Sequence, residues 1–418
     1  MSKGALAGLK VLDLSRVLAG PWATQILGDL GADVIKVERP VRGDDTRGWG
    51  PPEMEAGGDV FSAYYLACNR NKRSLALDLS SEDGAAVVRR LAASADVLVE
   101  NFKVGTLARY GLDYQALRTL NPGLVYCSIT GFGQTGPYAG RGGYDFLAQG
   151  MGGLMSVTGP VPDSPTKVGV PVADIFTGLY AVVAIQAALR YRDLTGRGQH
   201  IDCALLDTVV GILANQAMNW FVGGAVPSPM GNAHPNVVPY RTFAARDGQL
   251  IVAVGSDTQF RGLCQVLGRP ELAEHPDYSS NSCRVVNRVR LETLLEELIS
   301  AHARAWLLAR MEDLGVPGGP INTVDAVFQD PQVAARQMVE VLQVAGCGIA
   351  QLRFPALLSE SPAAMRLPPP ALGADGVTIL KELGLADADI ARLSRAGILY
   401  APDRAGIVSS QGERNGQA

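Results

Sequence analysis

The chain has 418 residues, of which 47% are hydrophobic and 19% are charged, and its formal net charge at pH 7 is −4. A chain of this length is longer than one that folds around a single hydrophobic core, so we expect two domains. The high hydrophobic and low charged fractions exclude a disordered chain. The nearly balanced charge argues against nucleic acid as a partner.

Cysteine and histidine usage argues against a metal site or a disulfide framework. The six cysteines are scattered without a CxxC pair, which is typical of free thiols in a reducing compartment. The four histidines are dispersed too, so no metal-ligand spacing occurs. The first ten residues lack the apolar core of a signal peptide, and no uninterrupted apolar run has the length of a bilayer span. We therefore expect a cytoplasmic protein without a membrane partner.

The first elements along the chain predict a parallel β-α-β unit. Residues 9–15 (LKVLDLS) form an apolar strand, residues 19–31 a loop and helix, and residues 32–38 (ADVIKVE) a second strand that ends at Glu38. Residues 41–60 are rich in Gly, Pro and Asp and predict a long loop of the kind that carries function.

The same alternation continues to residue 130. The predicted strands and helices cover residues 74–79, 82–95, 96–102, 114–121 and 124–130. The alternation predicts an α/β fold with an open, mainly parallel, Rossmann-like sheet and helices on both faces.

The character of the sequence changes near residue 225. Proline-punctuated loops and an AARDGQ turn between two apolar strands predict a smaller α+β domain. We assign residues 1–224 to a large α/β domain, 225–325 to the small domain, and 326–418 to a C-terminal part that returns to the large domain and ends in a polar tail.

Asp174 stands out because it is the single carboxylate between two apolar segments in residues 168–181, VGVPVADIFTGLYA. Such a carboxylate is costly to bury, so it either caps a helix or takes part in chemistry. One interpretation is an N-cap for a helix that continues as TGLYAVVAIQAALRYR. The other is a carboxylate nucleophile, whose ionisation a helix N-terminus would favour. The two interpretations are compatible.

The glycine motifs do not support a dinucleotide site. The loop after the first strand, SRVLAGP, lacks the second and third glycines of the fingerprint. A literal GxGxxG at residues 131–136 runs into Pro137, so no helix N-terminus follows to hold phosphate. Arginines and lysines recur beside loops at the expected carboxyl edge of the sheet, where they favour phosphate contacts.

Five ordered motifs resemble those of the class III CoA-transferases, the formyl-CoA transferase and carnitine-CoA transferase superfamily. They are LSRVLAGPWATQILGDLGADVIKVERP, CNRNKRSLALDL, VLVENFKVGTLARYGL, SITGFGQTGPYAGRGGYDFLAQ and VPVADIFTGLYA. The resemblance extends over residues 8 to about 400. It implies a large α/β domain made from both chain ends, a small domain, and two subunits threaded through one another as an interlocked homodimer.

The resemblance also implies roles for individual residues. The acid of the D-x-x-T-G motif is Asp174, which would accept the acyl group. A glutamine near the reaction centre of formyl-CoA transferase is Leu18 here, which argues against formate or oxalate as the acid. The implied CoA contacts, with a further candidate last, are Arg39, Lys72, Arg73, Asn101, Arg109 and Arg141.

The implied mechanism uses Asp174 as a relay, through an aspartyl anhydride and then an aspartyl-CoA thioester. The CoA thioester is a co-substrate, and no metal or permanently bound cofactor is needed. The partners are therefore an acyl-CoA, a carboxylic acid and a second copy of the chain.

Two rival functions are an α-methylacyl-CoA racemase of the same fold and a non-catalytic acyl-CoA-binding protein. Such racemases carry His-Asp where this chain has Tyr144-Asp145, and a phenol replaces imidazole poorly near pH 7. The presence of Asp174 argues against the non-catalytic alternative.

The region from residue 231 onward most resembles the succinyl-CoA:glutarate branch of the family, through residues 231–260, SCRVVNR and GVPGGPINT. The resemblance implies succinyl-CoA as donor and glutarate or a similar dicarboxylate as acceptor. Residues 255–259 replace the glycine-rich lid of formyl-CoA transferase. We further expect substrate contacts at Leu18, Arg47, Tyr144, His234 and Tyr240. His234 either holds the far carboxylate of a dicarboxylate or caps a loop turn.

Overall fold

The computed structural model describes residues 4–160, 164–344 and 346–402. The predicted polar tail at residues 409–418 lies outside them. Contacts divide the chain into two compact units, the first made of residues 1–153, 168–214 and 337–418, and the second of residues 154–167 and 215–336. The domain boundaries proposed after residues 224 and 325 remain predictions.

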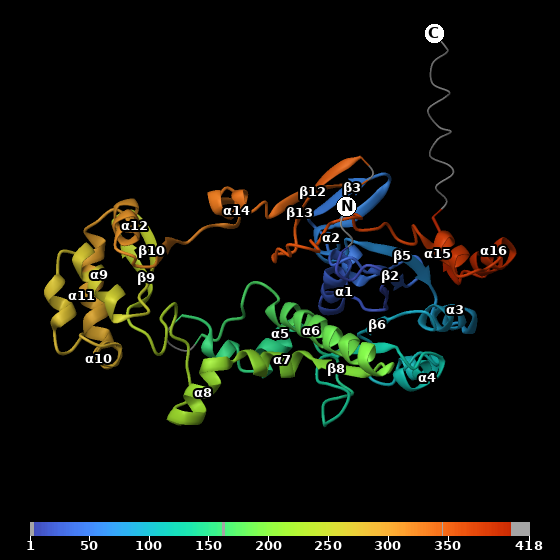
Figure 1. The fold of residues 1–418 in the computed structure, drawn as a ribbon, viewed down its shortest axis with the longest axis horizontal. Coiled ribbons are helices and arrows are strands. Elements are labelled where there is room, and N and C mark those ends of the chain that lie inside the picture. Colours follow the sequence, from blue (N-terminus) through green and yellow to red (C-terminus); the bar gives the residue numbers. More distant parts are fainter. Residues whose placement is uncertain (1–3, 161–163, 345, 403–418) are drawn as a thin grey trace, which may run out of the picture. The chain divides into compact units, whose positions relative to one another are not determined.

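A seven-stranded sheet organises the first unit, in the order β14-β5-β2-β1-β6-β7-β8 (Figure 1). Neighbouring strands are parallel, except that β14 pairs antiparallel with β5. The strands are β1 (Lys10–Asp13), β2 (Asp33–Glu38), β5 (Lys72–Leu77), β6 (Val97–Glu100), β7 (Val125–Thr130), β8 (His200–Ala204) and β14 (Leu399–Tyr400). Without β14, the order is that of the doubly wound Rossmann fold. The predicted α/β fold and mainly parallel sheet are confirmed.

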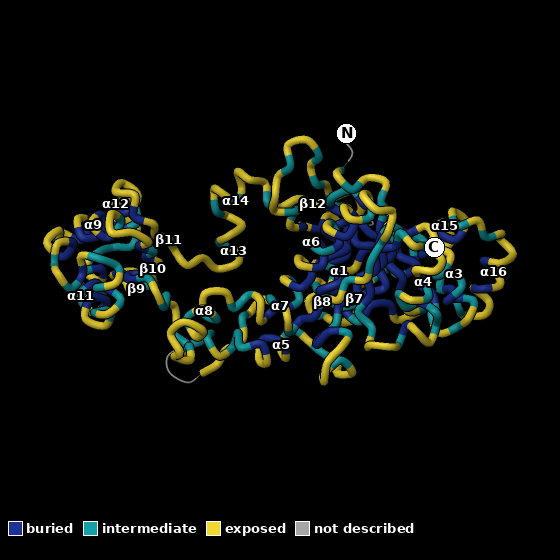
Figure 2. Tube along the Cα trace, turned by 60° about the horizontal axis from the view of Figure 1, so that its bottom comes forward, coloured by how far each residue is buried: buried dark blue, intermediate teal, exposed yellow. Residues whose placement is uncertain are grey.

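Helices cover both faces of this sheet. One face carries a core built from Leu12 of β1 together with apolar side chains of α3, α4, α15 and α16. On the other face, α1 contacts β1, β2 and β6, and α6 contacts β7, β8 and α1. Buried residues accordingly concentrate along the strands and the inner sides of these helices (Figure 2). The helices are α1 (Ala19–Asp29), α3 (Glu82–Ala92), α4 (Tyr114–Leu120), α6 (Val172–Thr195), α15 (Gly376–Glu382) and α16 (Asp387–Arg395).

Helix α6 begins earlier than the sequence suggests. Its first residue is Val172, and Pro171 occupies the N-cap position, so Asp174 is the third helical residue and is not the cap. Gly178 lets α6 approach α1 closely, because a Cβ at this position would lie 2.7 Å from the carbonyl oxygen of Ala19. Length and composition alone would allow α6 to cross a membrane, contrary to our expectation of no such segment. Its packing against α1, β7 and β8 makes it a helix of the folded unit.

The predicted loop at residues 41–60 contains regular structure. Strands β3 (Glu53–Ala56) and β4 (Asp59–Ser62) pair as a hairpin, and a 3-10 helix spans Asp45–Gly48. Gly57 and Gly58 both have positive φ, as a tight two-residue hairpin turn requires. A second hairpin, β12 (Val339–Val344) with β13 (Cys347–Leu352), shares a small core with it.

The second unit contains an antiparallel sheet, which β9 (Tyr240–Ala245), β10 (Gly248–Ala253) and β11 (Gly318–Pro320) form. The predicted turn between two strands at AARDGQ is confirmed. Helices α9 (Asp257–Val266), α10 (Asn281–Val286), α11 (Arg288–Ser300) and α12 (Arg304–Asp313) belong to the same unit. The remaining helices are α2 (Ala63–Cys68), α5 (Asp145–Met151), α7 (Leu205–Ile212), α8 (Ala214–Gly223), α13 (Val324–Val327) and α14 (Pro331–Ala335). Further 3-10 turns are Leu107–Tyr110, Met155–Val157 and Pro270–Glu274.

Candidate active site

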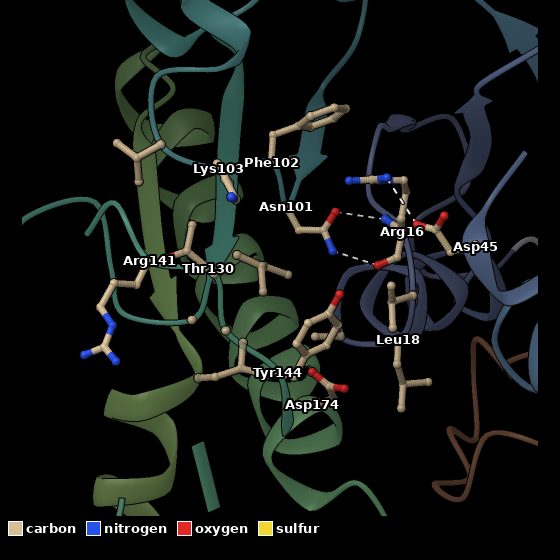
Figure 3. Close-up of a pocket in the computed structure, with 18 of the residues that line it drawn as sticks. Arg16, Leu18, Asp45, Asn101, Phe102, Lys103, Thr130, Arg141, Tyr144 and Asp174 are labelled. Carbon is tan, nitrogen blue, oxygen red and sulfur yellow. Dashed lines mark hydrogen bonds and ion pairs between the residues drawn. The ribbon is translucent and has the colours of Figure 1, made fainter. Parts of the chain in front are cut away.

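A pocket of about 360 Å³ opens at the carboxyl ends of β1, β6 and β7 (Figure 3). Its walls include residues 16–19 after β1, residues 101–104 after β6, and residues 129–131 at the end of β7. Strands β1 and β6 are neighbours at the point where the chain order of the sheet reverses. Ligands of open α/β sheets bind at such a switch point, so the topology alone marks this pocket as the candidate site.

Asp174 lies in this pocket near Leu18 and Tyr144 (Figure 3). Its carboxylate accepts no hydrogen bond from the part of the chain that the structure describes. Burial, and secondly the negative charge of Asp145, raise the pKa of Asp174 to about 7. These two effects outweigh the helix N-terminus, which the sequence suggested would favour the charged form.

Asp145, at the start of α5, supplies the cap that Asp174 does not provide. Its Oδ1 accepts from the backbone N–H of Ala173 at 2.8 Å and of Asp174 at 3.4 Å. Its Oδ2 accepts from Gln149 Nε2 at 2.7 Å, and Gln149 Oε1 accepts from the backbone N–H of Val168 at 2.9 Å. Asp145 and Gln149 together fix the segment that leads into α6, which leaves the Asp174 side chain free to face the pocket.

Asn101 ties the β1 loop to the β6 loop. Its Oδ1 accepts from the backbone N–H of Arg16 at 2.9 Å, and its Nδ2 donates to the Arg16 carbonyl at 2.7 Å. The Arg16 guanidinium lies 5.4 Å from the centre of the Phe102 ring and pairs with Asp45 at 3.2 Å. Asn101 therefore positions Arg16 at the pocket wall.

A buried ion pair holds the next residue, Val17, in a rare conformation. Val17 has φ of 70°, which a β-branched residue seldom adopts. Its backbone N–H donates to Asp44 Oδ1 at 3.2 Å, and Asp44 Oδ2 accepts from Lys36 Nζ at 2.9 Å. Burial opposes the ionisation of Asp44, but the Lys36 charge and hydrogen bonds from Thr46 outweigh it and lower the pKa of Asp44 to about 2.

The structure brings five of the sequence-predicted site residues to the pocket. They are Leu18, Asn101, Arg141, Tyr144 and Asp174. The Arg141 guanidinium packs over the rings of Phe132 and Tyr138. Arg39 does not line the pocket but pairs with Asp45, which does.

Three other predicted cations are engaged elsewhere. Lys72 is fully buried, and its Nζ donates to Asp13, to the Pro21 carbonyl and to Asn69, each within 3.0 Å. The implied CoA contact of Lys72 stays a prediction, and in the structure its ammonium donates to these three groups.

Arg73 and Arg47 are also paired with carboxylates away from the pocket wall. Arg73 pairs with Asp33 and Glu382, towards the amino ends of β2 and β5. Arg47 forms two hydrogen bonds of 2.8 Å with Glu38 and does not line the pocket. Neither residue lines the pocket, and their predicted ligand contacts stay predictions.

The remaining predicted residues also lie outside the pocket wall. Arg109 is exposed in the 3-10 turn after β6. His234 and Tyr240 belong to the second unit, where their rings are 5.3 Å apart. His234 Nδ1 accepts from the backbone N–H of Asn236 at 3.1 Å, so His234 caps a loop turn, as one of our two interpretations stated.

Sequence analysis did not single out Arg16, Asp45, Lys103 or Asp145. The first and third directly follow predicted strands, which is a usable signal for Arg16 and Lys103. Asp45 and Asp145 act through partners that are distant in sequence. No group of three potential metal ligands occurs within residues 4–160, 164–344 and 346–402.

Comparison with known proteins identifies the class to which this fold and site belong. The family model of CoA-transferase family III matches residues 6–376. The chain belongs to CoA-transferase family III and is a CoA-transferase, which confirms the resemblance. Enzymes of this class use a CoA thioester as co-substrate.

Individual relatives cover nearly the whole chain. A succinate–glutarate CoA-transferase of Agrobacterium fabrum is 51% identical over 388 residues, which are 91% of this chain and 96% of that protein. A human succinyl-CoA:glutarate CoA-transferase is 43% identical over 396 residues, covering 94% and 90%. The crystal structure of a CAIB/BAIF family protein from Brucella suis is 53% identical, covers 92% of this chain and 100% of that one, and has a TM-score of 0.81.

Proposed function

We propose that this enzyme transfers CoA from succinyl-CoA to glutarate or a similar dicarboxylate, with Asp174 as the acyl-accepting nucleophile. The observation that carries the proposal is the carboxylate of Asp174, which lies in the pocket without a hydrogen bond from the described residues. The substrates follow from the relatives that are named for succinate or succinyl-CoA and glutarate.

Each chemical step exchanges one acyl bond for another. A carboxylate oxygen of Asp174 attacks the thioester carbonyl, the carbon–sulfur bond breaks, and a mixed anhydride and CoA thiolate form. The thiolate attacks the aspartyl carbonyl, which releases succinate and leaves an aspartyl-CoA thioester. Glutarate then attacks this thioester, and the released thiolate attacks the glutaryl carbonyl, which regenerates the Asp174 carboxylate. No net proton is gained or lost.

The environment of Asp174 suits this chemistry. An ionised carboxylate that accepts no hydrogen bond has its lone pairs available for attack. A pKa near 7 also makes the ionised form more basic than an ordinary carboxylate while a useful fraction remains ionised at neutral pH. Asp145 accepts hydrogen bonds from the backbone N–H groups of Ala173 and Asp174, and these bonds do not involve the Asp174 carboxylate, so capping does not reduce its reactivity.

Pocket cations provide sites for the anionic parts of the substrates. We assign CoA contacts to Asn101 and Arg141 of the wall and to Arg39, which pairs with Asp45 beside it, as the resemblance implies. Arg16 and Lys103 join them as residues of the wall and are candidates for the far carboxylate of the dicarboxylate in place of Arg47.

We also propose the interlocked homodimer that the resemblance implies. Helix α6 exposes an apolar stripe at helical spacing, Phe176, Tyr180 and Val183, and its side chains are 40%, 50% and 64% exposed. An exposed apolar face of this kind marks an interaction surface. Light scattering should give a dimer at every concentration, since linked chains cannot separate without unfolding. A folded, active monomer on dilution would contradict this assembly. We expect the dimer in the cytoplasm.

The mechanism can be tested by trapping. The enzyme is incubated with succinyl-CoA and no acceptor, and the peptide that contains Asp174 is analysed by mass spectrometry for a CoA adduct. The same incubation with a chiral 2-methylacyl-CoA in deuterated water tests the racemase alternative. We expect the CoA adduct and no catalytic exchange of the α-hydrogen for deuterium. Rapid exchange without an adduct would indicate that the enzyme is a racemase and would contradict CoA transfer.

The acceptor can be tested separately with glutarate and valerate, which differ in the far carboxylate. A charge-assisted hydrogen bond to that carboxylate is worth about 1.5–3 kcal/mol, or roughly ten- to a hundredfold in specificity. Initial rates with succinyl-CoA as the common donor should show this preference. Equal rates with glutarate and valerate would contradict the proposal that the acceptor is a dicarboxylate, but they would not contradict CoA transfer itself.

A further inference from the structure

A single carboxylate bridges two arginines at the edge of the pocket. Asp45 pairs with Arg16 through Oδ2 at 3.2 Å and with Arg39 through Oδ1. Arg16 and Asp45 both line the pocket. The side chains of Arg16, Asp45 and Arg39 are 32%, 40% and 48% exposed, so solvent reaches all three partners.

The charge of Asp45 is opposite to what the substrates need. Among the described residues of the wall, the acids are Asp174 and Asp45, and the cations are Arg16, Lys103 and Arg141. A CoA thioester and a dicarboxylate are both anions, so a second carboxylate at the wall repels them. Asp174 is explained by the chemistry of acyl transfer, whereas Asp45 needs another explanation.

Other contacts fix the loops on which this ion pair lies. The Arg16 backbone is held by both hydrogen bonds of Asn101. Asp44, immediately before Asp45, caps the 3-10 helix and accepts hydrogen bonds from Lys36 and the Val17 backbone. Asp45 is therefore not required to hold the loops together, and its own ion pairs are of the exposed kind that contributes little to stability.

We propose that Asp45 is an internal anion that keeps Arg16 and Arg39 oriented until an anionic group of a substrate takes its place. Carboxylate and phosphate groups present similar oxygen pairs to a guanidinium, so one can replace the other. The incoming group is a phosphate of CoA or the far carboxylate of the acid substrate. This inference rests on the proposed function and adds a residue that sets substrate affinity by being displaced.

Replacing Asp45 by Asn tests the proposal, because Asn keeps the shape and one acceptor and removes the negative charge. The Asp33→Asn variant is the matched control, since Asp33 also pairs with an arginine but lies at the amino end of β2. Free CoA is titrated calorimetrically into each protein, and the KM for glutarate is measured at saturating succinyl-CoA. We expect Asp45→Asn to lower either the Kd for CoA or the KM for glutarate by about three- to tenfold at low salt. Asp33→Asn should leave both values unchanged.

The two measurements distinguish the sources of the anion. Tighter CoA binding with an unchanged KM for glutarate identifies a CoA phosphate, and the reverse result identifies the carboxylate. The gain should shrink as salt is added, and Asp45→Glu should keep wild-type affinity. Weaker or unchanged affinity for both ligands, or an equal gain in Asp33→Asn, would overturn the proposal. If the wild-type enzyme did not transfer CoA from succinyl-CoA to glutarate, the proposed function would be refuted. The CoA titration would still test the role of Asp45.

Discussion

Asp44 and Asp174 are two aspartates beside the same pocket, and their surroundings are opposite. Asp44 is fully buried, pairs with Lys36, and accepts hydrogen bonds from Thr46 and Val17. Asp174 accepts none from the described part of the chain and has the negative charge of Asp145 near it. The pKa of the first is lowered to about 2 and that of the second is raised to about 7. Burial raises both values, so the presence or absence of partners decides the direction in which the pKa of each carboxylate moves.

The largest expected effect comes from removing the unpartnered carboxylate. Asp174→Asn and Asp174→Ala should lower kcat for CoA transfer by about 10³-fold or more, because no other group forms the acyl bond. Circular dichroism and light scattering should show an unchanged fold and assembly. Asp33→Asn, which removes a carboxylate far from the chemistry, should retain wild-type kcat. A kcat of Asp174→Ala within tenfold of the wild-type value would refute the proposal that Asp174 is the nucleophile.

Removing the partnered carboxylate should instead affect stability. Asp44→Ala leaves the Lys36 ammonium buried without its ion-pair partner, which typically costs about 3–5 kcal/mol of unfolding free energy. Asp33→Asn breaks an ion pair with half-exposed Asp33 and should cost less than about 1 kcal/mol. Urea denaturation of both variants measures the difference. Similar losses in the two would show that the Lys36–Asp44 pair is not specially stabilising.

The dependence of the unfolding free energy on pH below 4 should also distinguish Asp44 from Asp174. The folded pKa of Asp44 lies below its unfolded value of 3.8, so its stabilisation is complete above about pH 4 and declines towards pH 2. Asp44→Ala should lack this part of the decline. The free energies of unfolding of variant and wild type should therefore converge as the pH falls from 4 to 2.

Sequence reasoning predicted the edge of the sheet at which the pocket opens and one residue of its wall, Asp174. Strand alternation placed the loops after residues 15, 102 and 130 at one edge, and the D-x-x-T-G motif singled out Asp174. Both are local properties: strands are short apolar runs, and a motif is contiguous. Asn101 was predicted from the resemblance, through the contiguous motif VLVENFKVGTLARYGL, and it lines the pocket directly after β6.

The hydrogen-bond and ion-pair partners of the charged side chains could not be predicted from the sequence, because many of these partners are distant along the chain. Arg47 donates to the Pro370 carbonyl across 323 residues, and nothing near Arg47 in the sequence announces that contact. The α6 cap comes from Asp145, 28 residues before Ala173. Expected caps are sought next to a helix, so the start of α6 was predicted too late, and Asp174 was given a role that another element supplies.

The ionisation of Asp174 should set the acid limb of the pH–rate profile. Only the carboxylate form attacks the thioester, so kcat/KM for succinyl-CoA should fall about tenfold per pH unit below a pKa near 7. Asp145→Asn removes the nearby negative charge but keeps an acceptor for the α6 cap, and it should move this limb to lower pH. A limb near pH 4 in the wild type, or no movement in Asp145→Asn, would contradict the electrostatic account.

The smallest effect is a gain in stability on removing the reactive group. The folded pKa of Asp174 lies above its unfolded value of 3.8, so ionisation penalises the folded state, and the penalty grows as the pH rises from about 4 to about 7 and is complete above that. Asp174→Asn is nearly isosteric and never ionises. Its Tm should exceed that of the wild type by about 1–4 °C at pH 8, which allows for water in the pocket, and should match it near pH 4. Thermal melts across this range measure the difference. A Tm gain that is independent of pH would mean that packing or the dimer, rather than the unpartnered charge, limits stability at this position.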